Sequence, residues 1–328
     1  MNFEDLVDIK ENSIVGIDYY LLDILLKDMT TGKNIKWCTD NYSNKGELYS
    51  KDSEITIPLI TGYNGNVIRP RTKKSKTEQD IRIRKKAEVF TPAWMCNEQN
   101  SFIDDSWFGK KNVFNKVVEK GWKPCKRKIK FENGKTWQDY VLNKRMEIAC
   151  GEAPYLVSRY DTTSGKVISI MDRIGILDRK LRIINENIDE EKEWINWVIK
   201  AYKSVYGFEW QGDSLLIARE NLLYTFTDNY FYKFSKKPDL ETVEEIAKII
   251  SWNIWQMDGV KCVVPDSCKK GVEIRYTIFG EEREEHECIG CLKNNNKLHN
   301  GIYCKIMNWD TGRKIKFLSL LEKKEKNR

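Results

Sequence analysis

The segment Met146–Leu156, which reads MEIACGEAPYL, constrains the fold more than any other part of this sequence. A short run of apolar and acidic residues leads into Ala149-Cys150-Gly151, and a turn of small residues, Glu152-Ala153-Pro154, follows. If the run is a strand and the next element is a helix, this turn exposes bare main chain at the carboxyl end of the strand. A ligand can approach such a main chain closely, so the segment predicts a binding loop on an α/β sheet.

A second strand–turn–helix unit is predicted at Val205–Leu223, VYGFEWQGDSLLIARENLL. Glu209 closes the strand, Gly212-Asp213 makes the turn, and apolar residues at helical spacing follow. A carboxylate in this position offers two acceptor oxygens side by side, which suits the two hydroxyls of a ribose. A third apolar strand is predicted within Ile249–Lys261, ending at Asp258.

These segments resemble the cofactor motifs of adenine-N6 DNA methyltransferases, and in particular the M subunits of restriction-modification systems. Residues 147–153 resemble the Asp-Pro-Ala-Cys-Gly-x-Gly loop, Phe90-Thr91-Pro92 resembles the motif that opens the catalytic domain, and 209–223 resembles the second cofactor motif. The resemblance implies an α/β, Rossmann-like S-adenosylmethionine-dependent methyltransferase core with N-terminal and C-terminal appendages. The cofactor contacts that it implies are Phe90, Thr91, Pro92, Glu147, Cys150, Gly151, Ala153, Glu209 and Asp258, the last facing the adenine of the cofactor.

The catalytic signature of that family is missing. Its members act through an (Asn/Asp/Ser)-Pro-Pro-(Tyr/Phe/Trp) loop, whereas none of the seven prolines of this chain adjoins another. Asn308-Trp309-Asp310 has suitable residue types but lacks the rigid turn. Two functions therefore stay open. One is an M-type subunit that binds S-adenosylmethionine and DNA and needs a second subunit carrying the Pro-Pro loop, or works beside a restriction subunit. The other is a non-catalytic DNA-binding protein with a methyltransferase-like fold.

The excess positive charge of the chain is concentrated in Arg69–Lys86. This segment holds nine basic and two acidic residues, which equals the net charge of +7 for the whole chain. A strip of this kind suits contact with DNA phosphates, and a solvated basic loop is the alternative. The candidate DNA contacts are Arg69, Arg71, Lys73, Lys74, Lys76, Arg82, Arg84, Lys85 and Lys86.

A cysteine-rich segment follows the predicted core. Five of the nine cysteines and both histidines lie between Cys262 and Cys304. Cys288 and Cys291 have the spacing of a metal-ligand pair, and a tetrahedral zinc needs two more ligands nearby. The predicted set for one structural zinc is Cys268, Cys288, Cys291 and Cys304, with His299 as the other candidate partner. A group of unrelated thiols is the alternative.

The predicted organisation has three parts. Residues 1–86 form a mixed subdomain with the basic strip, 87–261 form the methyltransferase-like domain with an insertion at 160–200, and 262–328 form the cysteine-rich segment. Helices are predicted over residues 13–29 and 190–205, and strands over 53–68.

Smaller features complete the expectations. Thr91 is expected to cap a helix whose first residue is Pro92. No apolar run approaches the roughly 20 residues that span a bilayer, so no membrane contact is expected. The N-terminus lacks a signal-peptide layout and the cysteines are expected to be reduced, which predicts a cytoplasmic protein.

Overall fold

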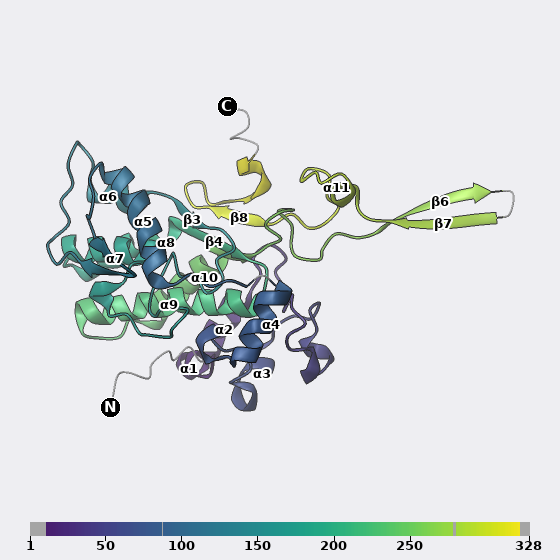
Figure 1. The fold of residues 1–328 in the computed structure, drawn as a ribbon, viewed down its shortest axis with the longest axis horizontal. Coiled ribbons are helices and arrows are strands. Elements are labelled where there is room, and N and C mark those ends of the chain that lie inside the picture. Colours follow the sequence, from purple (N-terminus) through teal and green to yellow (C-terminus); the bar gives the residue numbers. More distant parts are fainter. Residues whose placement is uncertain (1–10, 87, 278–279, 322–328) are drawn as a thin grey trace.

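A three-stranded parallel sheet organises the fold. The computed structural model describes residues 11–86, 88–277 and 280–321. The sheet contains β3 (Arg145–Glu147), β4 (Val205–Glu209) and β5 (Ile254–Gln256) in the order β3-β4-β5. Parallel neighbours need long crossover connections, and helices supply them here. The chain is therefore a mixed α/β protein (Figure 1).

Two pairs of helices form the crossovers. Helices α7 (Ile176–Asn187) and α8 (Glu191–Lys203) connect β3 to β4, and α9 (Gly212–Phe234) and α10 (Leu240–Asn253) connect β4 to β5. The strand–turn–helix unit predicted over residues 205–223 is confirmed, because α9 begins three residues after β4 ends. The helix predicted over residues 190–205 is α8. Residues 160–200, the predicted insertion, hold α7 and most of α8.

The two faces of the sheet contact different apolar clusters. Side chains alternate along a strand, so Val205 and Ile254 lie in the main helical core while Phe208 and Trp255 face the other side. That second side is covered by C-terminal residues, including Cys304, Ile306 and Phe317. They belong to or adjoin the ribbon of β8 (Lys305–Asn308) and β9 (Arg313–Lys316).

The N-terminal helices share the main core with the crossover helices. α1 (Glu11–Ile17) packs on α2 (Tyr19–Leu26), and α2 packs on α9 and α10. α9 is buried on all sides over residues 212–223, where other helices such as α2 pack on it, and becomes partly exposed toward its end. The helix predicted over residues 13–29 is thus confirmed but interrupted at Asp18, whose side chain accepts from the main-chain N–H groups of Tyr20 and Leu21 and so starts a new helix.

The remaining elements lie around this core. An antiparallel hairpin, β6 with β7, extends away from the rest of the molecule (Figure 1). The bounds of these elements are α3 (Ile57–Ile60), α4 (Lys76–Lys86), α5 (Ala93–Phe108), β1 (Asn115–Val118), β2 (Gly121–Pro124), α6 (Trp137–Leu142), β6 (Gly271–Thr277), β7 (Gly280–His286) and α11 (Ile289–Leu292). Within the described ranges, no helix combines the length and the apolar character that a membrane crossing requires.

One prediction of secondary structure is wrong, and another has the wrong extent. The strands expected over residues 53–68 are instead the short helix α3 and a 3-10 turn, Gly62–Asn64. Pro58 stands in the first turn of α3, and Ile57 and Ile60 are buried there, so the β-branched side chains serve helix packing. The strand expected within Ile249–Lys261 is shorter than predicted, because α10 continues to Asn253 and leaves only Ile254–Gln256 extended.

Candidate functional site

The loop after β3 adopts an unusual main-chain conformation. Ala149, Gly151 and Ala153 all have positive φ, at 49°, 54° and 63°. A left-handed alanine costs roughly 1–2 kcal/mol, so its surroundings must hold it in place. One such contact is the main-chain N–H of Cys150, which donates to the carbonyl of Phe208 in β4 at 2.9 Å. The loop is therefore held against the end of the neighbouring strand.

Glu147, at the end of β3, connects the two ends of this loop through hydrogen bonds. Its carboxylate accepts from the main-chain N–H groups of Tyr155 at 3.3 Å and Leu156 at 3.1 Å. Burial raises the pKa of Glu147 to about 8, and the charge of Glu209 adds to the increase, although the two N–H groups oppose it. The carboxyl group thus takes up a proton readily near neutral pH.

Glu209, at the end of β4, links the two loops that follow the strands. One carboxylate oxygen accepts from the main-chain N–H of Gly151 at 2.9 Å. The other accepts from Trp210 at 2.8 Å and Gln211 at 3.1 Å. Burial raises the pKa of Glu209, and these N–H groups oppose the increase. A carboxylate offers about four acceptor positions, so about one remains for a ligand.

A cavity of about 600 Å³ lies where these loops meet. Three stretches that are distant in sequence line it. They are residues 88–91, residues 147–151 with 154 and 155, and residues 209–211 with 214. The cavity therefore opens at the carboxyl ends of two adjacent parallel strands, where open α/β sheets bind ligands. Its volume is within the usual range of small-molecule sites.

Six of the nine predicted cofactor contacts line this cavity, namely Phe90, Thr91, Glu147, Cys150, Gly151 and Glu209. Ala153 is instead fully buried. Asp258 is occupied elsewhere, because its carboxylate accepts from the main-chain N–H groups of Val260 and Lys261, each at 3.0 Å. Asp258 is not among the cavity-lining residues.

Pro92 also has a different position from the one predicted. Helix α5 begins at Ala93, so Pro92 is the residue before the helix and Thr91 is not its cap. The main-chain N–H of Ala93 donates to Asp161 at 2.7 Å, so a distant carboxylate supplies the cap that Thr91 was expected to provide.

Nine residues of the cavity wall were not among the predicted contacts: Glu88, Val89, Ile148, Ala149, Pro154, Tyr155, Trp210, Gln211 and Ser214. Trp210, Gln211 and Ser214 follow Glu209 within five residues. Their position in the turn after a predicted ligand residue is the sequence signal that could have indicated them. Tyr155 is presented by the loop that Glu147 closes.

Two of the nine predicted DNA contacts are buried, which corrects that prediction. Lys74 and Arg82 lie 3.4 Å and 2.8 Å from the carboxylate of Asp213, and all three side chains are buried. Although burial favours the neutral acid, the charges of Arg82 and Lys74 hold the pKa of Asp213 well below its usual value. Arg82 also forms an ion pair with Glu88. These two cations therefore stabilise the fold beside the cavity and are not free to contact phosphates.

The other basic residues of the strip have mixed surroundings. Lys73, Lys76 and Arg84 are exposed. Arg69 pairs with Glu78 at 3.1 Å, and the guanidinium of Arg71 lies over the ring of Phe90, 5.2 Å from its centre. The side chains of Lys85 and Lys86 lie outside the described part of the structure.

Asn308-Trp309-Asp310 lies at the opposite end of the sheet from the cavity. Asp310 pairs with Lys144, directly before β3, at 2.6 Å. The indole N–H of Trp309 donates to Asn253, directly before β5, at 2.8 Å. Both contacts are at the amino ends of the strands, so this triplet does not reach a ligand in the cavity.

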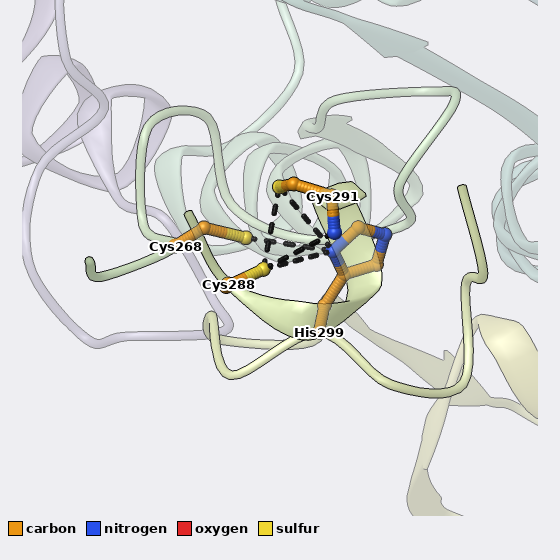
Figure 2. Close-up of side chains that lie close together, drawn as sticks. All are labelled: Cys268, Cys288, Cys291 and His299. Atoms are coloured by element: carbon orange, nitrogen blue, oxygen red, sulfur yellow. Dashed lines mark hydrogen bonds between the residues drawn. The ribbon is translucent and has the colours of Figure 1, made fainter. Parts of the chain in front are cut away.

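A group of metal-ligand side chains forms at the base of the β6–β7 hairpin (Figure 2). The Sγ atoms of Cys268, Cys288 and Cys291 and a ring nitrogen of His299 all lie within 4.8 Å of one another. Three of the four predicted ligands are thus brought together. The fourth is His299 in place of Cys304, whose thiol donates to the carbonyl of Gln256 at 3.4 Å within the second apolar cluster.

Cys288 is the most acidic thiol of this group. Burial raises its pKa, but hydrogen bonds from His299 and from the main-chain N–H groups of Asn300 and Cys291 outweigh burial and lower the pKa to about 6. A thiol with this pKa is mostly thiolate at neutral pH, and the thiolate is the form that binds metals. The group can therefore hold a metal ion.

Comparisons with known proteins do not assign this chain to a family. A scan of family models gives no match. Searches of curated proteins and of solved structures give no match either.

Proposed function

We propose that this chain binds S-adenosylmethionine in the cavity and is the cofactor-binding subunit of an adenine-N6 DNA methyltransferase of the restriction-modification type. One observation carries the proposal: the residues that resemble three separate cofactor motifs line a single cavity at the ends of β3 and β4. A Rossmann-like core is part of the same proposal, supported by the parallel strand order and the helical crossovers.

The cavity wall suits this cofactor in shape and charge. Gly151 has no side chain, and a Cβ atom there would come within 3.8 Å of the Phe90 ring, so the main chain is open to a ligand. Glu209 retains acceptor capacity for a ribose hydroxyl. S-Adenosylmethionine carries a positive sulfonium and would supply the methyl group. The carboxylate of Glu209 would favour a cation beside it, whereas Glu147 holds a proton near neutral pH.

A partner chain is part of the proposal because the chain has no Pro-Pro pair. Among the described residues β3 pairs only with β4, so the other edge of β3 has no neighbouring strand. A groove of about 280 Å³ lies over one face of the sheet and includes Met146 of the β3 edge, with Phe317 and Leu320 also in its wall. An extended apolar segment of the subunit that carries the catalytic loop would pair with the edge and fill this groove.

The remaining parts of the proposal concern DNA, metal and location. Lys73, Lys76 and Arg84 would contact DNA phosphates. The metal of the cysteine–histidine group would be zinc. The protein would act in the cytoplasm, with or beside a restriction subunit. A non-catalytic DNA-binding protein with this fold is the alternative, and methyl transfer separates the two.

Cofactor binding is tested by titration calorimetry on matched glycine variants. Gly151 and Gly312 both have positive φ, at 54° and 66°, but only Gly151 lines the cavity. Valine has a similar conformational cost at either position, so the difference between the variants reports on the cavity. We expect Gly151→Val to weaken S-adenosylmethionine binding at least about tenfold and Gly312→Val to leave it unchanged. No heat of binding to the wild-type chain at millimolar cofactor would end the proposal.

Catalysis is tested by transfer of labelled methyl groups to mixed-sequence DNA. We expect no transfer by this chain alone and transfer after addition of the partner subunit. The reason is that the amino nitrogen of adenine is a poor nucleophile, which must be hydrogen-bonded and held in line with the methyl group. Tight DNA binding without transfer in either case would establish the non-catalytic alternative.

A further inference from the structure

The two ends of the β6–β7 hairpin meet at the cysteine–histidine group. Cys268 lies three residues before β6 begins, and Cys288 lies two residues after β7 ends. Cys291 is in the short helix α11, and His299 is in the loop that follows. Figure 2 shows the four side chains pointing toward one another. Side chains from the residue segments before β6 and after β7 therefore meet at the base of the hairpin.

The nitrogen–sulfur distances match those of a tetrahedral zinc site. With Zn–S bonds of about 2.3 Å and Zn–N bonds of about 2.0 Å, a sulfur and a nitrogen ligand lie about 3.5 Å apart and two sulfurs about 3.8 Å apart. The Nδ1 atom of His299 lies 3.7, 3.5 and 3.7 Å from the sulfurs of Cys268, Cys288 and Cys291. The sulfurs of Cys288 and Cys291 are 3.3 Å apart, so they would have to separate by about 0.5 Å on a shared ion. All three nitrogen–sulfur distances thus agree with one shared ion.

The surrounding main chain is shaped to bring the ligands this close. A Cβ atom on Gly290 would lie 2.5 Å from the main-chain nitrogen of His299, and a Cβ on Gly301 would lie 3.0 Å from the sulfur of Cys268. Larger residues at either glycine would separate the ligands. The main-chain N–H of Cys291 lies 3.4 Å from the sulfur of Cys288 and donates to it, as N–H groups commonly do beside a metal-bound thiolate.

The position of His299 is also fixed from outside the group. Its main-chain N–H donates to the hydroxyl of Tyr303 at 3.1 Å. That hydroxyl donates in turn to the carbonyl of Asn296 at 2.7 Å. The loop that carries the histidine is therefore tied on both sides of the ligand, which favours a preformed site.

We infer that Cys268, Cys288, Cys291 and His299 Nδ1 hold one structural zinc ion, and that this ion locks the base of the projecting β6–β7 hairpin. Three thiolates and one imidazole are the soft ligand set that selects zinc over magnesium or calcium. Four protein ligands complete a tetrahedron, so no position is left for water or a substrate. Binding releases the thiol protons, and the metal joins segments that otherwise have few apolar contacts.

The inference is independent of the proposed cofactor site, because none of the four ligands lines the cavity between β3 and β4. The test uses the full chain, purified without chelator and then supplied with zinc or cobalt(II). We expect one zinc per chain by elemental analysis, and cobalt spectra with thiolate charge-transfer bands and tetrahedral d–d bands. His299→Ala and Cys288→Ser should lose the metal. Cys304→Ser is the matched control, because Cys304 is a buried cysteine of the same segment that lies outside the group, and it should retain the metal.

Hydrogen exchange gives a second measurement that does not depend on the variants. Adding a strong chelator to the wild-type chain should increase exchange in residues 268–299 and leave the cavity loops and S-adenosylmethionine binding unchanged. Absence of zinc after reconstitution, an octahedral cobalt spectrum, or equal metal loss in Cys304→Ser and Cys288→Ser would each overturn the inference.

Discussion

Replacement of Glu209 by glutamine tests whether this carboxylate joins the two cavity loops. The carboxylate accepts three main-chain N–H groups, from Gly151, Trp210 and Gln211. Glutamine keeps the size of the side chain but has a single acceptor oxygen, and its amide nitrogen only donates. The lower-cost orientation keeps the oxygen on Trp210 and Gln211, so the amide NH₂ then faces the N–H of Gly151.

The expected loss follows from that one unsatisfied donor. A buried donor without an acceptor costs about 1–3 kcal/mol, so we expect Glu209→Gln to lower the free energy of unfolding by about 2 kcal/mol. S-Adenosylmethionine affinity should fall at least about tenfold, equivalent to about 1.4 kcal/mol, because the loop at Gly151 moves and a negative charge beside the cavity is removed. The losses of stability and of affinity are expected in the same variant, because the Glu209 side chain both joins the two loops and faces the cofactor.

Urea denaturation followed by tryptophan fluorescence measures the stability, and titration calorimetry measures the affinity. Glu119→Gln is the matched control, since Glu119 is exposed and lies outside the cavity wall, and it should change neither quantity. If Glu209→Gln keeps both the wild-type unfolding midpoint and the wild-type affinity, the proposed link between the two loops is wrong.

Three further predictions concern charge. Glu147 has a folded-state pKa of about 8 against an ordinary value of 4.5, so the folded state retains a proton that the unfolded state has lost. Its contribution to stability therefore declines as pH rises from 4.5 to 8, and Glu147→Gln should flatten this part of a stability–pH curve measured by urea denaturation. Asp213 has the opposite shift, so its stabilising effect is present above its unfolded pKa of about 4 and disappears as the pH falls. Asp213→Ala removes the buried carboxylate that Lys74 and Arg82 share, leaving Arg82 with Glu88 alone, and should cost about 3–5 kcal/mol at pH 7, with little loss in strongly acidic solution. Replacing Lys73, Lys76 and Arg84 by glutamine should reduce the slope of log DNA affinity against log salt by about 0.9 for each phosphate that is no longer neutralised, and an unchanged slope would show that these residues are only solvated.

The local units of the fold could be predicted from the sequence because short-range patterns determine them. The segment 205–223 predicts a strand, a turn and a helix within nineteen residues, and it forms β4 and the start of α9. The resemblance implied that Glu147 and Glu209 share one cofactor site, and both line the same cavity. Parallel strands place their carboxyl ends at one edge of a sheet, so residues far apart in sequence meet there.

The tertiary structure decided which polar residues are available. Lys74 and Arg82 belong to a strip that is strongly basic in sequence, yet Asp213, more than a hundred residues away, draws both into the interior. A charge run predicts exposure only when no buried partner of opposite charge exists, and spacing along the chain cannot reveal such a partner. The strands expected over residues 53–68 failed for a related reason, since β-branched side chains also pack well in a short helix against a core.

The cysteine–histidine group was likewise predicted in part by the sequence and completed by the tertiary structure. The Cys288–Cys291 spacing by itself predicted a ligand pair, because two residues between cysteines suit one tetrahedral ion. The choice between His299 and Cys304 depended on the path of the chain after α11. Cys304 directly precedes β8 and is buried against the sheet, whereas the loop containing His299 returns to the base of the hairpin. Local chemistry determined the kind of site, and only packing across the sheet selected its fourth residue.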